Sequence, residues 1–288
     1  ARLHARCSTA SACNMAIKHK ITQATYVVTG ASRGIGKAIA HNLAARGADL
    51  ILISRDKKSL AATAAEIQEK HAGRAVTTLS CDLADPKAIE KTCAEIKKKH
   101  RALAGIINNA GYARPGYFHE LPADEFEKAI STDYLGAVHL TRGLHDLVIK
   151  GGLISFTSSV VGFMGVFGYS SYAGAKFALI GFAETLRQEL FARGIQISVL
   201  CPPDTATPGY ETENKTKPYE TAALSESAKL MTAEAVAEKY VRGVTKGKFI
   251  INCNFESAML YRLHGIWPSL VFSIMSGMIR KAQKKKSQ

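Results

Sequence analysis

The sequence predicts an α/β protein in which one doubly wound domain is built on a parallel sheet. From Thr25 onward, short and continuously apolar runs alternate with longer amphipathic stretches, which indicates strands covered by helices on both faces of a sheet. The first apolar run leads directly into a glycine-rich turn. Of the 288 residues, 47% are hydrophobic, so a large core is expected and disordered or fibrous architectures are excluded.

The expected strands and helices follow one another in regular order. Strands are predicted at 26–28, 50–53, 75–79, 103–107, 153–156, 195–200 and 249–251. Helices are predicted at 35–46, 59–71, 86–99, 123–148, 171–192 and 232–246. Neither an internal repeat nor a change of composition marks a boundary before about residue 204, so we expect a single domain.

The regular order is interrupted at 203–229, a stretch rich in Pro, Thr, Glu, Asn and Lys without a strand pattern. A connection this long inside a compact domain is usually functional or disordered. It falls between a strand and the next helix, on the side where such folds bind ligands. We therefore expect a substrate lid over 203–230, with a merely mobile loop as the alternative.

The N-terminal residues are expected to lie outside the folded domain. Residues 1–14 are small, polar and basic, they lack the apolar core of a secretory signal, and Met15 follows them. They are interpreted as a leader, a transit remnant or an expression scar. The folded domain is then expected to span 15–252.

The segment 253–288 is predicted to form an apolar helix and a basic tail. Its uninterrupted helical part, 269–279, reaches about 16 Å, which is too short for a bilayer core of about 30 Å. Ser269, Ser273 and Gly277 recur every four residues, so that side could pack closely against another helix. The apolar side and the basic tail favour a membrane-surface anchor. The alternative is a core or dimer-interface helix that closes the substrate pocket.

The formal charge of +14 indicates an anionic partner and leaves open nucleic acid, anionic lipid or a phosphorylated cofactor. The basic residues concentrate at the two ends of the chain. No zinc finger, RNA-binding signature or basic zipper accompanies them, so no nucleic-acid partner is expected. Six irregularly spaced cysteines predict neither a metal site nor a disulfide framework and favour a reducing compartment.

The predicted cofactor site follows the first strand, in the run Thr29-Gly30-Ala31-Ser32-Arg33-Gly34-Ile35-Gly36. Glycines allow a tight turn and the close approach of a pyrophosphate, whose charge the next helix N-terminus stabilises. After the second strand, Ser54 occupies the place of an acidic ribose ligand, and Arg55 and Arg33 suit a 2′-phosphate. The sequence therefore predicts NADPH, unless Arg55 merely faces solvent.

Three residues together predict acid–base chemistry on a carbonyl group. Tyr172 and Lys176 are four residues apart in a helical pattern and therefore share one face. A nearby ammonium is expected to lower the pKa of the phenol and so to suit it for proton transfer. Ser159, at the end of a strand, is placed to hydrogen-bond the same carbonyl oxygen.

Four motifs in this order and spacing resemble the classical short-chain dehydrogenase/reductase family over roughly residues 22–252. They are the run 29–36, Asn108-Asn109-Ala110-Gly111, Ser159, and Tyr172-Ala173-Gly174-Ala175-Lys176. The resemblance implies a seven-stranded Rossmann sheet in the order 3-2-1-4-5-6-7 and a Ser-Tyr-Lys catalytic set. The cofactor contacts that we expect from the motifs are Gly30, Ser32, Arg33, Gly34, Ile35, Gly36, Arg55, Asp82, Leu83, Asn109, Ala110, Gly111, Tyr172, Lys176, Pro202 and Thr205.

One position departs from the family pattern. The family's helix asparagine, which takes part in a proton relay with the lysine, falls on Asp133. The resemblance implies that the asparagine acts largely through its backbone carbonyl, which Asp133 retains. Asp133 is therefore a fourth candidate catalytic residue, and its carboxylate could alter the pKa of Tyr172.

The start of the 203–230 segment is similar to the substrate loop of 3-ketodihydrosphingosine reductases. The similar runs are Pro202-Pro203-Asp204-Thr205-Ala206-Thr207-Pro208-Gly209, Glu213-Asn214-Lys215-Thr216-Lys217-Pro218 and Glu220-Thr221. This resemblance implies NADPH-dependent reduction of 3-ketosphinganine to sphinganine in sphingolipid synthesis. The alternatives are reduction of another lipophilic ketone, such as a 3-oxoacyl thioester or a steroid, and a non-catalytic dinucleotide-binding protein.

Such a substrate pairs a cationic amine with a long chain, and it needs an apolar groove and a nearby carboxylate. The candidate wall residues, for which ordinary loop packing is the alternative, are Phe163, Met164, Val166, Phe167 and Tyr169. Asp204, Glu211 and Glu213 are candidates to face the amine, with solvent exposure as the alternative. We also expect a homo-oligomer at the cytoplasmic face of a membrane. In a eukaryote that membrane would be the endoplasmic reticulum. In a bacterium the protein would be located at the inner membrane or in the cytoplasm.

Overall fold

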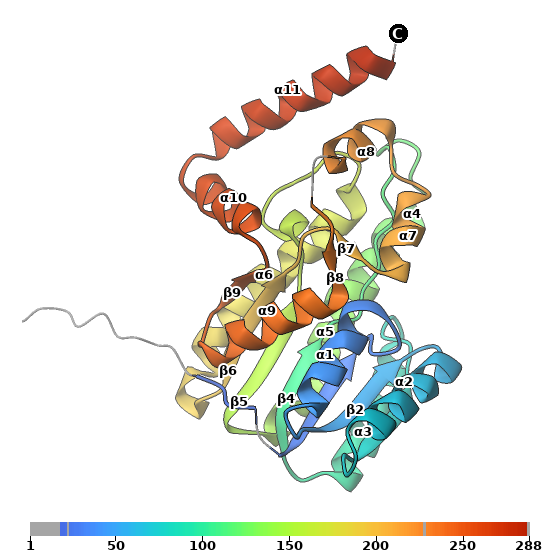
Figure 1. The fold of residues 1–288 in the computed structure, drawn as a ribbon, viewed down its shortest axis with the longest axis vertical. Helices are drawn as coiled ribbons and strands as arrows, with labels where there is room; N and C mark the ends of the chain where they lie inside the picture. The colour runs from blue at the N-terminus through green and yellow to red at the C-terminus, as the bar shows by residue number, and fades with distance from the viewer. Residues whose placement is uncertain (1–17, 22, 227–228, 287–288) are drawn as a thin grey trace, which may run out of the picture.

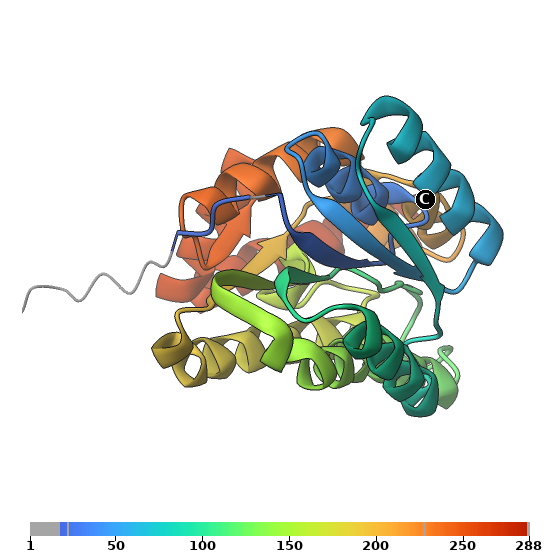
Figure 2. The same cartoon turned by 90° about the horizontal axis from the view of Figure 1, so that it is seen from below.

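A computed structural model describes residues 18–21, 23–226 and 229–286 of the chain. The predicted leader, 1–14, lies outside the described residues. The described chain forms three layers, with helices on both faces of a twisted parallel sheet (Figures 1 and 2). The prediction of a doubly wound α/β domain is confirmed.

The central sheet has seven strands in the order β3-β2-β1-β4-β5-β6-β9, which confirms the predicted topology. The strands are β1 (Thr25–Thr29), β2 (Asp49–Ser54), β3 (Val76–Ser80), β4 (Leu103–Asn108), β5 (Val148–Thr157), β6 (Gln196–Cys201) and β9 (Ile250–Asn252). All neighbouring pairs are parallel. The strand order reverses beside β1, so a crevice for ligands is expected at the carboxyl ends of β1 and β4.

Each face of the sheet carries its own set of helices and its own apolar core. One core joins the sheet to α1 (Gly34–Ala44), α2 (Lys57–Lys70) and α9 (Ala233–Thr245). The other joins it to α3 (Pro86–Lys99), α5 (Gly136–Leu144) and α6 (Ser170–Glu189). Burial of both faces explains why the strand sequences are continuously apolar rather than alternating.

The single helix expected at 123–148 is divided, and that prediction is wrong in its detail. The chain forms α4 (Ala123–Ala129), a π-helical turn (Ile130–Leu135), α5 and a 3-10 turn (His145–Leu147), and Val148 already begins β5. Gly136 permits this arrangement, because a Cβ there would lie 2.6 Å from the Leu83 carbonyl oxygen. The π turn carries Asp133 inward, and such turns are common at functional sites.

The 203–230 segment has more regular structure than its composition predicts. It contains the strand β7 (Thr205–Ala206) and the helices α7 (Pro208–Asn214) and α8 (Tyr219–Ser225). β7 pairs with β8 (Met231–Thr232), which follows the segment. The Thr207 side chain accepts a hydrogen bond from the Tyr210 N–H and so caps α7. Proline at the first position of α7 and Pro218 before α8 favour helix starts that a simple apolar pattern does not reveal.

The C-terminal segment forms two helices, α10 (Phe255–Ile266) and α11 (Pro268–Lys286). The helix expected at 269–279 is longer than predicted, because the basic tail continues it: Lys, Arg, Gln and Ala favour helices, and cations suit a helix C-terminus. Packing of Ser269, Ser273 and Gly277 against another helix stays a prediction. These residues are exposed in the chain, and α11 packs through its other side, with Val271 and Ala282 buried.

In Figure 1, α11 runs along the end of the molecule that carries α8, and it packs against α8 and α10. Lys286 Nζ donates a hydrogen bond to the Tyr117 hydroxyl at 2.9 Å, and that hydroxyl donates to Glu220 at the start of α8. Among the described helices, none is long and apolar enough to cross a membrane.

A buried hydroxyl pair connects β5 to α9. Ser155 Oγ and the Tyr240 hydroxyl lie 2.6 Å apart, and both side chains are fully buried. Tyr240→Phe leaves Ser155 without this partner, so we expect the free energy of unfolding to fall by about 1–3 kcal/mol, measured by urea denaturation. Removing both hydroxyls, with Ser155→Ala added, should destabilise less than the sum of the two single changes. Strict additivity would contradict the coupling.

Candidate active site

The glycine turn after β1 has the geometry that a dinucleotide requires. Gly30 has φ +64° and Gly34 has φ +58°, a region that favours glycine. A Cβ on Gly36 would lie 2.4 Å from the Gly30 carbonyl oxygen and 2.5 Å from Asn109 Nδ2. The turn therefore cannot accept side chains without moving, which leaves the backbone open to a ligand.

The first turn of α1 fits a pyrophosphate group. It contains no acidic residue, and Arg33 at its N-cap makes no side-chain capping bond to the helix N–H groups. Free N–H groups at a helix N-terminus attract phosphate. Thr207 of the 203–230 segment packs against this turn, since its Cγ2 would lie 3.1 Å from a Cβ on Gly34.

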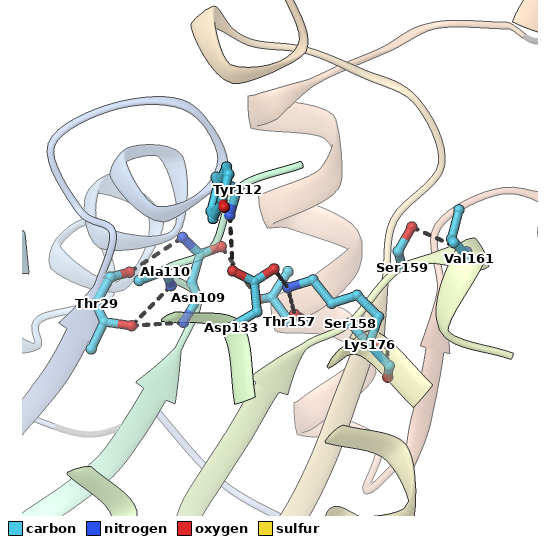
Figure 3. A network of polar contacts seen from close by, with 10 residues as sticks. All are labelled: Thr29, Asn109, Ala110, Tyr112, Asp133, Thr157, Ser158, Ser159, Val161 and Lys176. Carbon is cyan, nitrogen blue, oxygen red and sulfur yellow. Dashed lines mark hydrogen bonds and ion pairs between the residues drawn. The ribbon is translucent and has the colours of Figure 1, made fainter. Parts of the chain in front are cut away.

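Three strand ends are connected by hydrogen bonds beside this turn (Figure 3). Thr29 Oγ1 accepts from the backbone N–H groups of Asn109 and Ala110, at 2.9 and 3.0 Å. Asn109 Nδ2 donates to the Thr29 carbonyl, and Thr157 Oγ1 donates to Asn109 Oδ1. Thr29 is the first residue of the predicted glycine run, whereas the sequence does not indicate Thr157, because a lone threonine at a strand end carries no distinctive pattern.

The end of β2 also fits the predicted 2′-phosphate. Arg33 and Arg55 are exposed there, and the buried hydroxyl of Ser54 makes no hydrogen bond with the described residues. The nearby carboxylate of Asp56 is engaged, because it caps α2 by accepting from the N–H groups of Lys58 and Ser59. The polar groups left free at this point are therefore donors, which suit a phosphate.

The other predicted cofactor contacts lie around the same crevice. Leu83 is buried, and Asp82 Oδ1 accepts from the Ala84 N–H at 3.0 Å. The Pro202 carbonyl accepts from the Val160 N–H, and Thr205 Oγ1 donates to the Pro203 carbonyl. A Cβ on Gly111 would lie 2.9 Å from Lys176 Nζ, so Gly111 allows the lysine to reach the strand ends.

The structure brings the predicted catalytic side chains together. Ser159 lies near enough to the Tyr172 hydroxyl to lower its pKa, and Lys176 Nζ lies 5.3 Å from the centre of the Tyr172 ring. Ser159 follows β5 and accepts from the Val161 N–H at 3.2 Å, which fixes its side chain (Figure 3). Tyr172 and Lys176 lie one turn apart on α6, so the helix presents both to the same point.

Asp133 and Lys176 form a buried ion pair at 3.2 Å, with side chains that are 0% and 3% exposed. Lys176 Nζ also donates to the Thr157 carbonyl at 3.0 Å, and Asp133 Oδ1 accepts from the Tyr112 N–H at 3.0 Å (Figure 3). In the family pattern a neutral asparagine would stand here. The carboxylate adds a negative charge beside the lysine instead.

The environment of Tyr172 favours its protonated form, contrary to the sequence-based expectation. Its pKa is raised well above the usual value, first because burial disfavours the phenolate and then because the carboxylates of Asp133 and Glu213 repel it. The lysine that was expected to lower this pKa is paired with Asp133. A protonated phenol is the form that can donate a proton to a ketone oxygen.

The candidate amine-facing carboxylates separate into two groups. Glu211 is exposed on α7, whereas Asp204 and Glu213 lie near enough to Tyr172 for their charges to raise its pKa. Tyr169 lies between them and the site: its ring is 5.9 Å from that of Tyr172, and its hydroxyl donates to Glu213.

The candidate apolar wall is mostly buried. Phe163, Met164 and Tyr169 are buried, and Val166 and Phe167 are half-buried. Phe163 meets Tyr261 of α10 edge to face at 5.1 Å, beside a shallow pocket of about 300 Å³. The pocket is lined by Phe163, Tyr261, Arg262, His264, Gly265 and Ile266. The described residues contain no group of His, Cys, Asp and Glu that could hold a metal ion.

Comparison with known proteins agrees with this geometry. The family model for short chain dehydrogenases matches residues 24–218. The chain belongs to the short-chain dehydrogenase family. This dehydrogenase is 37% identical over 266 residues to the 3-dehydrosphinganine reductase of Danio rerio, an alignment that covers 90% of this chain and 79% of the relative.

Two further comparisons extend the likeness. The 3-ketodihydrosphingosine reductase of Dictyostelium discoideum is 40% identical over 243 residues, which cover 78% of this dehydrogenase and 73% of the relative. The structure of a short-chain dehydrogenase from Sphingobium yanoikuyae in complex with NADPH matches with a TM-score of 0.73 at 27% identity. That match covers 86% of this chain and 95% of the other.

The carboxylate of Asp133 should determine the pH dependence of this dehydrogenase. If Tyr172 donates a proton, kcat/KM for ketone reduction falls as the pH rises through the pKa of Tyr172. Asp133→Asn removes a charge that raises this pKa, so the alkaline limb should move to lower pH. NADPH oxidation measured across the pH range tests this. Asp124→Asn changes an exposed carboxylate on α4 and is the control, in which the alkaline limb should not move. An alkaline limb that stays in place or moves to higher pH in Asp133→Asn would contradict the interpretation.

Proposed function

We propose that the chain is an NADPH-dependent reductase that converts 3-ketosphinganine to sphinganine. The observation that carries the proposal is the meeting of Ser159, Tyr172 and Lys176 beside the glycine turn, at the carboxyl ends of β1, β4 and β5. The substrate assignment is supported by the relatives, which are named for this ketone and align over most of both chains.

NADPH is the cofactor that the site supports. The α1 N-terminus would hold the pyrophosphate, Arg33 and Arg55 would pair with the 2′-phosphate, and Ser54 would offer its free hydroxyl. A related structure contains NADPH in the same fold. When bound, the cofactor supplies the hydride that reduces the C3 carbonyl group.

The side chains of this chain supply the proton and the orientation. Tyr172 donates its phenolic proton to the carbonyl oxygen as the carbon is reduced, and Ser159 donates a hydrogen bond to the same oxygen. Lys176 stands behind the phenol, held by Asp133 and the Thr157 carbonyl, and its charge stabilises the phenolate that remains. Asp133 thus acts through Lys176 and is a positioning residue.

The proposal is tested by turnover of 3-ketosphinganine with NADPH and with NADH. We expect a clear preference for NADPH, and a loss of kcat by about 10²–10⁴-fold in Tyr172→Phe, because the proton donor is removed while the ring remains. Tyr219→Phe, an exposed tyrosine on α8, is a matched control that should retain activity. Reduction that survives Tyr172→Phe would overturn the mechanism, and preferential turnover of a 3-oxoacyl thioester or a steroid would overturn the substrate.

We propose further that α10 and α11 bind a membrane surface. Their exposed apolar side chains are Phe255, Met259, Ile266, Trp267, Phe272, Ile274 and Met278. The basic residues Arg280, Lys281, Lys284 and Lys285 are exposed on the same last helix. Apolar insertion and attraction to anionic lipid then act together. Two further points stay predictions: that the protein forms a homo-oligomer, and that it is located at the cytoplasmic face of a membrane.

Sedimentation with lipid vesicles checks the membrane surface. The chain should sediment with vesicles of phosphatidylserine and phosphatidylcholine more than with phosphatidylcholine alone, and salt should weaken this binding. The double change Phe272→Ser and Ile274→Ser should lower the bound fraction several-fold. Phe191→Ser, which alters an exposed aromatic residue in the turn between α6 and β6, should not. Equal binding of both variants would contradict the proposal.

A further inference from the structure

The 203–230 segment carries a buried lysine between two carboxylates. Lys217 Nζ lies 3.4 Å from Glu213 Oε1 and 4.0 Å from Asp204 Oδ2, and 4.1 Å from the centre of the Tyr210 ring. The lysine side chain is only 3% exposed. Its ammonium forms these ion pairs but no hydrogen bond of regular geometry with the described residues. Charge attraction, rather than hydrogen bonding, therefore holds this ammonium between the two carboxylates.

The two carboxylates are held in place by tyrosines. The Tyr169 hydroxyl donates to Glu213 Oε1, and the Tyr210 hydroxyl donates to Asp204 Oδ2 at 3.1 Å. Glu213 is 17% exposed and Asp204 29% exposed, so both are largely withdrawn from water without being sealed off. The carboxylates are therefore positioned before any substrate arrives, and an incoming group can still reach them.

The charges of this cluster do not balance. Two carboxylates face one ammonium, which leaves one negative charge without a partner in a poorly hydrated place. Burial accordingly raises the pKa of Glu213, and the charge of Asp204 adds to this effect. One additional cation would neutralise the cluster.

The cluster lies within reach of the reacting carbonyl group. Tyr169, which hydrogen-bonds Glu213, is the ring neighbour of Tyr172 at 5.9 Å, and both carboxylates raise the pKa of Tyr172. In an α-amino ketone the nitrogen and the carbonyl oxygen are separated by three bonds and lie about 3 Å apart. The α-ammonium of a ketone held at Tyr172 would therefore lie close to the Tyr172 hydroxyl, and Tyr169 and Glu213 are neighbours of this tyrosine.

From this geometry we propose that Asp204 and Glu213 form the binding site for the ammonium group of an α-amino ketone. Lys217 is the internal counter-ion that keeps the two carboxylates in place, and the substrate supplies the second positive charge. The inference rests on the proposed function and deepens it, because it assigns the preference for an amino ketone over a neutral ketone to two named residues.

The experiment compares 3-ketosphinganine with the same long-chain 3-ketone that lacks the amino group. The wild type should prefer the amino ketone. Glu213→Gln and Asp204→Asn should each lower the ratio of kcat/KM for the amino ketone to kcat/KM for the neutral ketone by about 10–100-fold, the range expected for the loss of a charged hydrogen bond. Glu211→Gln, an exposed carboxylate of the same helix, is the matched control and should keep the preference.

The neutral ketone serves as an internal control for folding, because a variant with a damaged lid would lose both activities together. Equal losses on both ketones in both variants, or an unchanged preference in both, would overturn the inference.

A binding measurement separates this inference from the proposed function. Sphinganine, which carries the amine but no ketone, should bind the NADP⁺-loaded wild type more tightly than it binds loaded Glu213→Gln. If the wild type failed to reduce 3-ketosphinganine while this difference in binding held, the proposed function would fail and the amine site would stand. If the enzyme reduced the amino ketone but sphinganine bound both proteins equally, the amine site would be wrong.

Discussion

The carboxyl ends of β1, β4 and β5 lie side by side, and the hydrogen bonds of Thr29, Asn109 and Thr157 hold them together. The rest of the site depends on this convergence. Because the strands are parallel and their order reverses beside β1, segments that are distant in sequence open toward one crevice. The glycine turn enters it from one strand, and the loop that carries Ser159 enters it from another.

The electrostatics of the site depend on where water is excluded. Lys176 and Asp133 are almost completely buried, so their charges act strongly on each other and on Tyr172. A buried ion pair of this kind adds little net stability, because both charges lose their hydration. Its effect is on position and on the pKa of Tyr172: the lysine is held against the Thr157 carbonyl, and the charge of Asp133 raises the pKa of the phenol.

The C-terminal helix and the substrate segment are physically connected. α11 packs against α8, and Lys286, Tyr117 and Glu220 join them by consecutive hydrogen bonds. The helix with the exposed apolar face thus contacts the segment that carries Asp204 and Glu213. In the proposed function, a lipid ketone would pass from a membrane surface to the catalytic residues beside this contact. The shallow pocket between Phe163 and α10 is formed by residues that follow Ser159 in the chain. It offers apolar contact for a long substrate.

The sequence by itself determined the layered fold, the strand order through its family motifs, and the residues that the proposed mechanism uses. Such features are local: apolar runs predict buried strands, the glycines of 29–36 predict a tight turn, and a spacing of four residues places Tyr172 and Lys176 on one helix face. The expected helix 123–148 and the irregular lid were wrong in detail, because a π turn and short proline-started helices leave little periodic signal.

Only the tertiary structure decided how charges from different segments meet. The pairing of Asp133 with Lys176, the raised pKa of Tyr172 and the placement of Lys217 between Asp204 and Glu213 depend on distance and burial. The same holds for the side of α11 that faces the protein, which carries Val271 and Ala282 and not the stripe of small residues. Ionic interactions act through space and strengthen as water is excluded, so they cannot be inferred from the order of residues along a chain.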